Sequence, residues 1–158
     1  MGYYNSTSKG YNELHSEEQR KKVAIIKQNL KIKKSYILLD VGCGTGLSSD
    51  FDCNVYGIDP STELLKQSKI KNKILGRAEK NPFEGDFFDI VVSVTAIHNF
   101  DDAEKGLLEM KRVGKRDFAF SVLKKSKKFN EIKNAIKKNF KIKKTIEEEK
   151  DIIFFCGK

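Results

Sequence analysis

The sequence predicts an α/β fold, a doubly wound and mostly parallel seven-stranded sheet with helices on both faces and a C-terminal antiparallel hairpin. Two observations predict it. Short apolar runs alternate with segments of helical periodicity, as in folds built from strand–helix–strand units. The last two runs are separated only by the charged turn 147–150, and so short a connection joins antiparallel strands because a parallel return needs a longer crossover.

Seven apolar runs are the predicted strands. The first, residues 36–41, is almost continuously apolar, as expected for a parallel strand covered on both faces. The run at 140–146 alternates between apolar and polar residues, which is the period of a strand. The runs cover residues 36–41, 54–59, 73–75, 88–94, 118–122, 140–146 and 152–155.

Capping residues and helical spacing predict the helices between these strands. Ser16 and Gln19 form a capping box, and the helix that it opens places Val23, Ile26 and Leu30 on one face. The other helices are predicted as a brief stretch at 47–51, after Pro60-Ser61 with Leu64 and Leu65 inward, after Asp101-Asp102 with Leu107, Leu108 and Met110, and after Ser126 with Phe129, Ile132 and Ile136.

Length and composition fit one globular domain. A chain of 158 residues, 39% of them hydrophobic, can bury a core without disulfides or a structural metal. The sequence contains no repeat, low-complexity tract or linker. We therefore expect a single domain over residues 1–158, with an N-terminal helical segment (1–34), a central core (35–122), and a helix plus closing hairpin (123–158).

Several classes of protein are excluded at this stage. The longest apolar run, residues 90–94, is far too short to span a bilayer. The first residues lack the basic-then-apolar pattern of a signal peptide. The three cysteines are odd in number and widely spaced, which argues against a secreted disulfide scaffold and favours a cytoplasmic location.

The net charge of +9 is concentrated in the two flanks. Residues 1–34 carry +5 and residues 124–158 carry +7, whereas residues 35–123 carry −3. A basic surface attracts nucleic acid or anionic lipid. However, 27 of the 31 basic residues are lysines, a pattern that an AT-rich genome or a thermophilic host explains equally well.

A glycine loop follows the first predicted strand. Gly42, Gly44 and Gly46 allow a tight turn and a close approach of the backbone to a ligand. The dinucleotide fingerprint would need its third glycine at position 47, which is Leu47, and a P-loop would need a Lys-Ser/Thr pair. Pyrophosphate recognition is therefore poorly supported, and glycine turns without a function are common.

Asp59 ends the second predicted strand, 17 residues after Gly42. A carboxylate at this place can accept hydrogen bonds from both hydroxyls of a ribose. Alternatively, Asp59 caps the helix that follows. Together with the glycine loop, it indicates a ligand that contains a nucleoside but makes no demand for a phosphate site.

Four motifs, spread over about residues 35–122, resemble those of class I S-adenosylmethionine (SAM)-dependent methyltransferases. Their order and spacing follow the family pattern. They are residues 38–46 (LLDVGCGTG), 55–61 (VYGIDPS), 76–83 (GRAEKNPF) and 88–91 (FDIV). The resemblance implies a seven-stranded sheet with an antiparallel last strand, SAM as the cofactor, and S-adenosylhomocysteine as its product.

The resemblance also implies residue roles. Asp40 would shape the loop and bind the methionine part of SAM, directly or through water, and Ser93 would lie under the sulfonium with its neighbours. Residues 96–100 (AIHNF) would face the methyl acceptor, and Tyr11 would act as a lid. The implied cofactor-binding residues are Asp40, Gly42, Cys43, Gly44, Gly46, Asp59, Pro60, Ser61, Ala78, Glu79, Val94 and Thr95.

Methyl transfer is a displacement at a carbon that the cofactor has already activated, so the protein chiefly aligns and desolvates the reactants. His98 is the candidate base for a nitrogen or oxygen acceptor, and is equally consistent with a pocket wall residue that moves no proton. His15 is predicted to be exposed at a helix start. The cysteines show no metal spacing, so we expect no metal site.

Two departures from the family pattern are visible. The span from Gly46 to Asp59 is about one helical turn shorter than usual, and residues 113–116 (VGKR) replace a Lys-Pro-Gly-Gly turn. The chain also shows no inserted substrate domain. We therefore expect a small acceptor, an acceptor held on the domain's own surface, or a partner that completes the site.

Three functional interpretations remain at this stage. The first is methylation of tRNA, another RNA or a translation component, because residues 11–13 and 97–100 look similar to segments of tRNA wobble-uridine methyltransferases and the flanks are basic. The second is a small-molecule methyltransferase resembling the quinone-biosynthesis group. The third is a non-enzymatic partner subunit, against which the intact glycines and Asp59 count. The first is slightly preferred.

Overall fold

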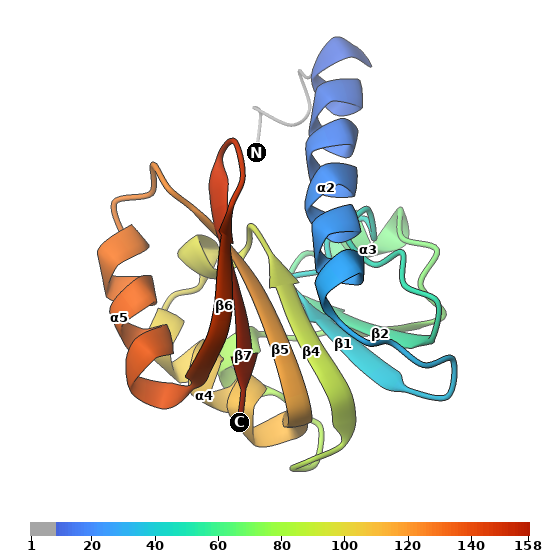
Figure 1. Cartoon of the computed structure of the whole chain (residues 1–158). Helices are drawn as coiled ribbons and strands as arrows, with labels where there is room; N and C mark the ends of the chain where they lie inside the picture. Colours follow the sequence, from blue (N-terminus) through green and yellow to red (C-terminus); the bar gives the residue numbers. More distant parts are fainter. Residues whose placement is uncertain (1–8) are drawn as a thin grey trace.

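The sheet has the strand order β3-β2-β1-β4-β5-β7-β6 (Figure 1). It is seen in a computed structural model that describes residues 9–158, with side chains from residue 13 onward. Strands β1 to β5 are parallel to one another, whereas β7 runs antiparallel to both β5 and β6. The predicted fold class is confirmed.

The strands lie close to their predicted positions. The largest difference is at β5, which begins four residues earlier than expected because Gly114 follows the preceding helix directly. A Cβ atom at Gly114 would lie within 2.5–2.8 Å of Phe118 and Val91, so only glycine fits this junction. The strands are β1 (Ile37–Val41), β2 (Asn54–Asp59), β3 (Asn72–Leu75), β4 (Phe88–Val94), β5 (Gly114–Leu123), β6 (Lys141–Glu147) and β7 (Asp151–Gly157).

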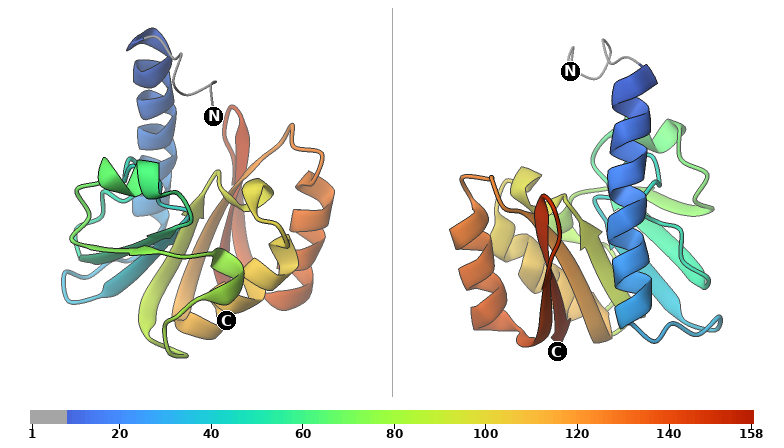
Figure 2. Two further views of the ribbon diagram at one scale, coloured as in Figure 1. Left: turned by 180° about the vertical axis from the view of Figure 1, so that it is seen from behind. Right: turned by 45° about the horizontal axis from the view of Figure 1, so that its top comes forward.

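Helices cover the two faces of the sheet unequally (Figure 2). On one face, α2 (Lys9–Asn29) buries Val23 and Ile26 against apolar residues of β1, β4, β5 and β7. On the other face, α4 (Ala103–Val113) and α5 (Phe129–Asn139) pack over β4, β5 and β6. Each face therefore has its own apolar core, and both cores centre on β4 and β5.

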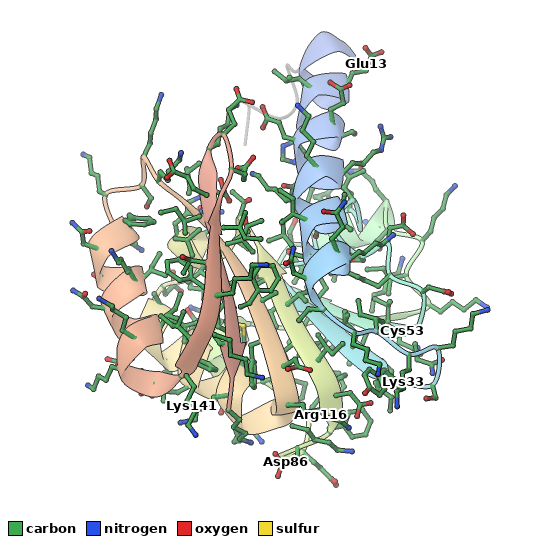
Figure 3. All side chains as sticks on the ribbon, viewed as in Figure 1. Glu13, Lys33, Cys53, Asp86, Arg116 and Lys141 are labelled. Carbon is green, nitrogen blue, oxygen red and sulfur yellow. The ribbon has the colours of Figure 1, made fainter. Side chains whose placement is uncertain are left out.

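Helix α2 begins at Lys9, seven residues before the predicted capping box. The capping-box prediction is therefore wrong, and Ser16 lies inside the helix. The segment ahead of Ser16 contains no proline, so the helix continues through it. The N-terminal part of α2 projects beyond the edge of the sheet, with Glu13 near its outer end (Figure 3).

The connection between β1 and β2 consists of turns. The helical stretch predicted at 47–51 is wrong. Phe51 is buried but Leu47 is exposed, so these residues do not share a buried helical face. The side chains of Ser48 and Ser49 instead donate hydrogen bonds to Asp40, and this fold-back shapes the segment. The next crossover contains only the five-residue helix α3 (Thr62–Lys66), capped by Ser61 as predicted.

The crossover from β3 to β4 contains only a short 3-10 turn, η1 (Ala78–Lys80). Four aromatic rings cluster beside it, with centroids 4.8–5.9 Å apart; they belong to Tyr56, Phe83, Phe87 and Phe88. Arg112 of α4 fixes the same segment, because its guanidinium donates hydrogen bonds of 2.9 Å to the carbonyls of Asn81 and Phe83.

The two helices on the opposite face begin differently. Asp102 caps α4 as predicted, and its side chain accepts a hydrogen bond from the Lys105 amide. The predicted cap of α5 is wrong: Ser126 lies in the turn before the helix, where its Oγ accepts from the Lys128 amide. The turn between β4 and α4 contains the short 3-10 element η2 (Ile97–Asn99).

The carboxyl ends of the parallel strands meet at one edge of the sheet, toward which α2 projects. The turns after β1, β2 and β4 therefore lie close together there. Within residues 9–158, no helix is both long enough and apolar enough to cross a lipid bilayer.

Candidate active site

The glycine loop after β1 adopts a backbone that favours glycine. The φ angles of Gly42, Gly44 and Gly46 are +80°, +53° and +89°. A Cβ atom on Gly42 would lie 2.6 Å from the Cβ of Ala96, so the loop packs directly against the segment after β4. The loop is held to β2 as well, because the amides of Gly42 and Cys43 donate to the Ile58 carbonyl.

Asp59 links the glycine loop to the end of β2. One carboxylate oxygen accepts from the Gly44 amide at 2.9 Å and the other from the Ser61 amide at 2.8 Å. The helix cap of α3 is Ser61, whose Oγ accepts from the Leu64 amide. Asp59 is therefore not the N-cap residue. It is 7% exposed, so it is buried but still reaches the surface of the cleft. Its oxygens retain lone pairs for hydroxyl groups of a ligand.

Asp40 lies behind the loop and is completely buried. Its Oδ2 accepts hydrogen bonds from Ser48 at 2.8 Å and Ser49 at 2.5 Å. Its Oδ1 has no hydrogen-bond partner among the described residues. Burial raises the pKa of this carboxyl to about 7, although the two serine hydrogen bonds oppose the rise. Asp40 thus shapes the loop, and it does not line the cleft in front of it.

Two adjoining pockets open in front of the loop. The larger, of about 1620 Å³, extends from α2 across the glycine loop to α3 and β2. The smaller, of about 470 Å³, lies between the turns that follow β3 and β4. Four residues border both pockets, so they form one continuous cleft: Gly42, Pro60, Asn99 and Phe100.

The predicted site residues divide between the two pockets. Ala78 and Glu79 line the smaller one. Glu79 also accepts a hydrogen bond from the Asp102 amide, and an ion pair between Arg77 and Asp101 joins the same two turns at the rim. The residues in the larger pocket are Cys43, Gly44, Gly46, Asp59, Ser61, Val94 and Thr95, and the shared border adds Gly42 and Pro60.

The segment after β4 differs in part from expectation. Ser93 does not face the cleft but is fully buried, and it donates to the Val41 carbonyl at the start of the glycine loop. Thr95 lines the cleft with a left-handed backbone, φ +51°. Of residues 96–100, Ala96, Asn99 and Phe100 border the cleft, whereas Ile97 belongs to the core.

His98 is half-buried beside the cleft and is not one of its lining residues. Its Nδ1 is buried without a hydrogen-bond partner among the described residues. Burial lowers the pKa of its imidazole below the usual value; Asp151 opposes this effect, and Lys128 and Lys22 add to it. The imidazole is therefore neutral at pH 7, the form that can accept a proton.

Sequence reasoning missed the contribution of α2. His15, predicted to be exposed at a helix start, is half-buried within the helix and lines the larger pocket together with Ser16 and Gln19. Lys22, one turn further along, forms a buried ion pair with Asp151. The only feature of the sequence that could have indicated the burial of Lys22 is its position next to Val23 and Ile26, which form the apolar face of the helix.

Two further expectations concern a lid and a metal. Tyr11 lies outside the residues whose side chains the structure describes. Among the described residues, no group of three or more histidine, cysteine or acidic side chains could hold a metal ion. All three cysteines are free, and burial raises the pKa of the Cys43 thiol, so this side chain is a neutral wall of the cleft.

Comparison with known proteins identifies the family. The profile of the methyltransferase domain matches residues 39–122, more than half of the chain. The chain belongs to the SAM-dependent methyltransferases. An uncharacterised protein of Methanocaldococcus jannaschii is 33% identical over 96% of this chain and 62% of its own length. The ubiquinone/menaquinone biosynthesis C-methyltransferase of Campylobacter jejuni is 31% identical over 69% of this chain and 53% of its own length.

This methyltransferase chain thus spans about half to three-fifths of the curated relatives described above. Solved structures share its fold at lower identity. A SAM-dependent methyltransferase from Aquifex aeolicus superposes with a TM-score of 0.73 at 17% identity, covering 90% of this chain and 97% of the other. A Haloferax volcanii protein in complex with the Trm112 methyltransferase activator superposes with a TM-score of 0.72 at 14% identity, covering 94% and 93%.

SAM is the cofactor of this family, and the cleft fits it. The three loop glycines have positive φ angles, and Gly42 lies too close to Ala96 for a Cβ atom, so it is the backbone of these glycines that borders the cleft. Asp59 offers acceptor atoms beside this space, as the hydroxyls of a ribose require. The smaller pocket, with the apolar Ala78 and Phe100 in its wall, suits a flat aromatic base.

Proposed function

We propose that this protein transfers the methyl group of SAM to an acceptor that enters the cleft beside the end of β4. One observation carries the proposal: the glycine loop, Asp59 and the turn after β4 converge on a single continuous cleft. The first two suit the nucleoside and amino-acid parts of the cofactor. The turn after β4 lies between these two features and the surface around His98.

The chain's own residues have three tasks in this reaction. Asp59 accepts the ribose hydroxyls, and the backbone of Gly42 to Gly44 borders the amino-acid part. Val94, Thr95 and Ala96 form the wall at the reactive end. Bound SAM supplies a methyl carbon activated by its positive sulfonium, so the protein acts mainly by aligning the acceptor and excluding water.

His98 is the candidate proton acceptor. Because burial lowers its pKa, the neutral imidazole predominates at pH 7 and can take a proton from a nitrogen or oxygen acceptor. An acceptor that reacts at carbon or sulfur, or that loses its proton beforehand, would need no such base. His98→Gln therefore separates the two cases: a loss of turnover with unchanged SAM affinity supports the base role.

SAM binding measured by calorimetry tests the proposal directly. We expect Asp59→Asn to weaken SAM affinity about tenfold or more, since the amide cannot accept from both hydroxyls and from two backbone amides. Asp86→Asn is the matched control, because Asp86 lies at the opposite edge of the sheet (Figure 3). Equal affinities for the wild type and Asp59→Asn would refute the ribose assignment.

For the acceptor we propose an RNA, with tRNA as the first candidate. The mouth of the cleft supports an anionic partner. Lys125 and Lys127 are exposed in the loop between β5 and α5, and the Lys128 ammonium donates a 3.1 Å hydrogen bond to the Phe100 carbonyl. Phe100 borders the cleft. A phosphate backbone bound to this loop would lie next to the reaction site.

Charge reversal in two places tests this acceptor class. Lys125→Glu/Lys127→Glu should reduce salt-dependent tRNA binding about tenfold, and methyl transfer to RNA with it. Lys137→Glu/Lys141→Glu makes the same change of charge away from the cleft; Figure 3 shows Lys141 at the far edge. Equal losses in both variants would indicate only nonspecific attraction.

A small-molecule acceptor is the alternative, favoured by the similarity to the Campylobacter jejuni quinone-biosynthesis enzyme. Tritium-labelled methyl transfer into separated cell RNA, protein and small molecules distinguishes the two classes. Label in the small-molecule fraction alone would overturn the RNA proposal. Label in no fraction, with SAM bound, would favour the third interpretation, a non-enzymatic partner subunit.

A protein partner is a further proposal. The Haloferax volcanii protein of similar fold is found with an activator, and we expect a partner here if the isolated chain binds SAM but transfers no methyl group. Addition of a lysate fraction that restores transfer would support this expectation.

A further inference from the structure

Four polar side chains meet in a buried cluster behind the reactive end of the cleft. Lys22 of α2 donates a 2.9 Å hydrogen bond to Thr95 Oγ1, and its Nζ lies 3.2 Å from Asp151 Oδ1. Asp151 Oδ2 accepts from Thr95 Oγ1 at 2.6 Å and from Ser121 Oγ at 2.5 Å. The cluster therefore joins α2, the turn after β4, β5 and β7 at one point.

The ion pair in this cluster is costly. The side chains of Lys22 and Asp151 are 3% and 0% exposed. Removing two charges from water costs several kcal/mol per ion, and apolar residues of similar volume often stabilise a fold equally well or better. Stability alone therefore does not account for the pair.

The backbone of Thr95 indicates what the cluster does. Its φ of +51° is unusual for a β-branched residue, and such a backbone persists only where the surroundings impose it. Three contacts impose it here: the hydroxyl bonds both Lys22 and Asp151, and the Thr95 amide donates to the Ser121 carbonyl at 2.9 Å. This turn directs Val94 and Ala96 toward the cleft, where Ala96 meets Gly42.

The same cluster fixes the opposite wall. His15 and Gln19 line the cleft from α2. Gln19 lies four residues and Lys22 seven residues after His15, so the three side chains share one helical face. Figure 1 shows α2 running past the ends of β1 and β4 toward this edge. Lys22 thus ties the helix wall to the Thr95 wall through Asp151.

We propose that Lys22 and Asp151 are positioning residues, a buried ion pair that sets the spacing between α2 and the left-handed turn at Thr95 around the reactive end of the cleft. The proposal rests on the proposed function, since it assigns that end to the methyl group. The pair itself touches neither reactant. It acts through Thr95 and through the helix face that carries His15 and Gln19.

Hydrogen exchange of the ligand-free protein and calorimetry with S-adenosylhomocysteine test this proposal. In Lys22→Met and in Asp151→Asn, we expect the amides of residues 94–99 and of α2 to exchange about tenfold faster, while those of β1 and α4 stay within twofold of wild type. S-adenosylhomocysteine affinity should fall about fivefold to twentyfold.

A surface ion pair provides the matched control. Lys150 and Glu18 join the same β6–β7 turn to α2 from outside, with Nζ and Oε1 2.5 Å apart. Glu18→Gln/Lys150→Met should leave affinity and the exchange of residues 94–99 unchanged within twofold. An equal effect in this control would mean that any link between the β6–β7 turn and α2 is enough to hold the cleft in place. That result would overturn the proposal.

A second variant guards against loss of folding. Thr95→Val keeps the side-chain shape but removes the hydroxyl, and should reproduce the local increase in exchange with a smaller loss of stability. Faster exchange throughout the sheet, or unchanged exchange at 94–99 in all three variants, overturns the proposal. If the wild type binds no S-adenosylhomocysteine, the proposed function fails, and the exchange of the ligand-free protein still decides the positioning role.

Discussion

The two halves of the sheet are built differently. Strands β4, β5, β7 and β6 are covered by three helices, α2, α4 and α5, and hold most of the buried aromatic and aliphatic residues. Strands β1, β2 and β3 are connected by turns and one five-residue helix, and a 3-10 turn leads from β3 to β4. The sparse half carries the glycine loop and Asp59, which we propose bind SAM through backbone groups and one carboxylate. The helix-covered half supplies the rigid wall at Thr95.

Because the two halves differ in this way, mutations in them should affect folding and cofactor binding to different extents. Changes in the helix-covered half should act first on stability, and changes in the sparse half first on the cofactor. Four tests, taken in decreasing order of expected free-energy change, probe the two halves.

The largest effect is expected in the helix-covered core. Phe118 is fully buried, and its ring lies 5.0 Å from that of Phe140 and 6.1 Å from that of Phe120. Phe118→Ala should lower the free energy of unfolding by about 3–5 kcal/mol, measured in urea. SAM affinity of the remaining folded protein should change less than about threefold. A loss of unfolding free energy below about 1 kcal/mol would show that the stability of the fold does not depend on the core of the helix-covered half.

Gly42→Ala should come next, with a loss of about 1–3 kcal/mol of binding free energy. The new Cβ would meet Ala96 at 2.6 Å on a backbone with φ +80°. Calorimetry with SAM measures the loss. Gly85→Ala is the control, because its nearest contact would be an ordinary 3.5 Å. Similar affinity in both variants would contradict the role of the loop backbone.

The pH dependence of Asp40 is the third test. Its pKa of about 7 in the folded protein exceeds the 3.8 of a free aspartate, so the folded state binds the proton more tightly. Stability from this group is therefore greatest at low pH and declines as pH rises toward 7. Between pH 5.5 and 8, the wild type should lose about 2 kcal/mol more unfolding free energy than Asp40→Asn. Parallel pH profiles would contradict this.

The smallest effect is expected at the rim of the smaller pocket. Arg77 and Asp101 are paired, but their side chains are 58% and 73% exposed. Exposed ion pairs contribute about 0–1 kcal/mol. Arg77→Met and Asp101→Asn should thus each change SAM affinity less than about fivefold, with the difference disappearing at high salt. A much larger, salt-independent loss would show that Arg77, which lines the smaller pocket, contacts the cofactor directly.

The sequence predicted most of this fold because strands and glycines have local signatures. The apolar runs at β2 and β4 matched the observed strands at both ends. The glycines and Asp59 were singled out by residue type and by their positions at strand ends, and the structure places them beside one cleft. The turns at 47–51 were missed because Leu47 and Phe51 have helical spacing, whereas contacts of Ser48 and Ser49 with Asp40 determine the backbone.

Contacts between residues far apart in the chain could not be predicted from local sequence patterns. Lys22 and Asp151 lie far apart in the chain and neither belongs to a motif. Ser93, which the family resemblance placed under the sulfonium, serves instead as a buried donor to Val41. In both cases the pleat and packing of the sheet, rather than local preference, determine which group a side chain meets.

Arg112 shows how a short chain can omit a crossover helix. A helix satisfies its backbone carbonyls internally, but the segment between β3 and β4 has almost no helix to do so. The planar guanidinium takes over that task by reaching two carbonyls at once, while Glu109 orients it at 2.7 Å. One side chain here satisfies two carbonyls that a helix would bond internally. Arg112→Lys is therefore a drastic change, since an ammonium lacks the planar fork that spans both oxygens.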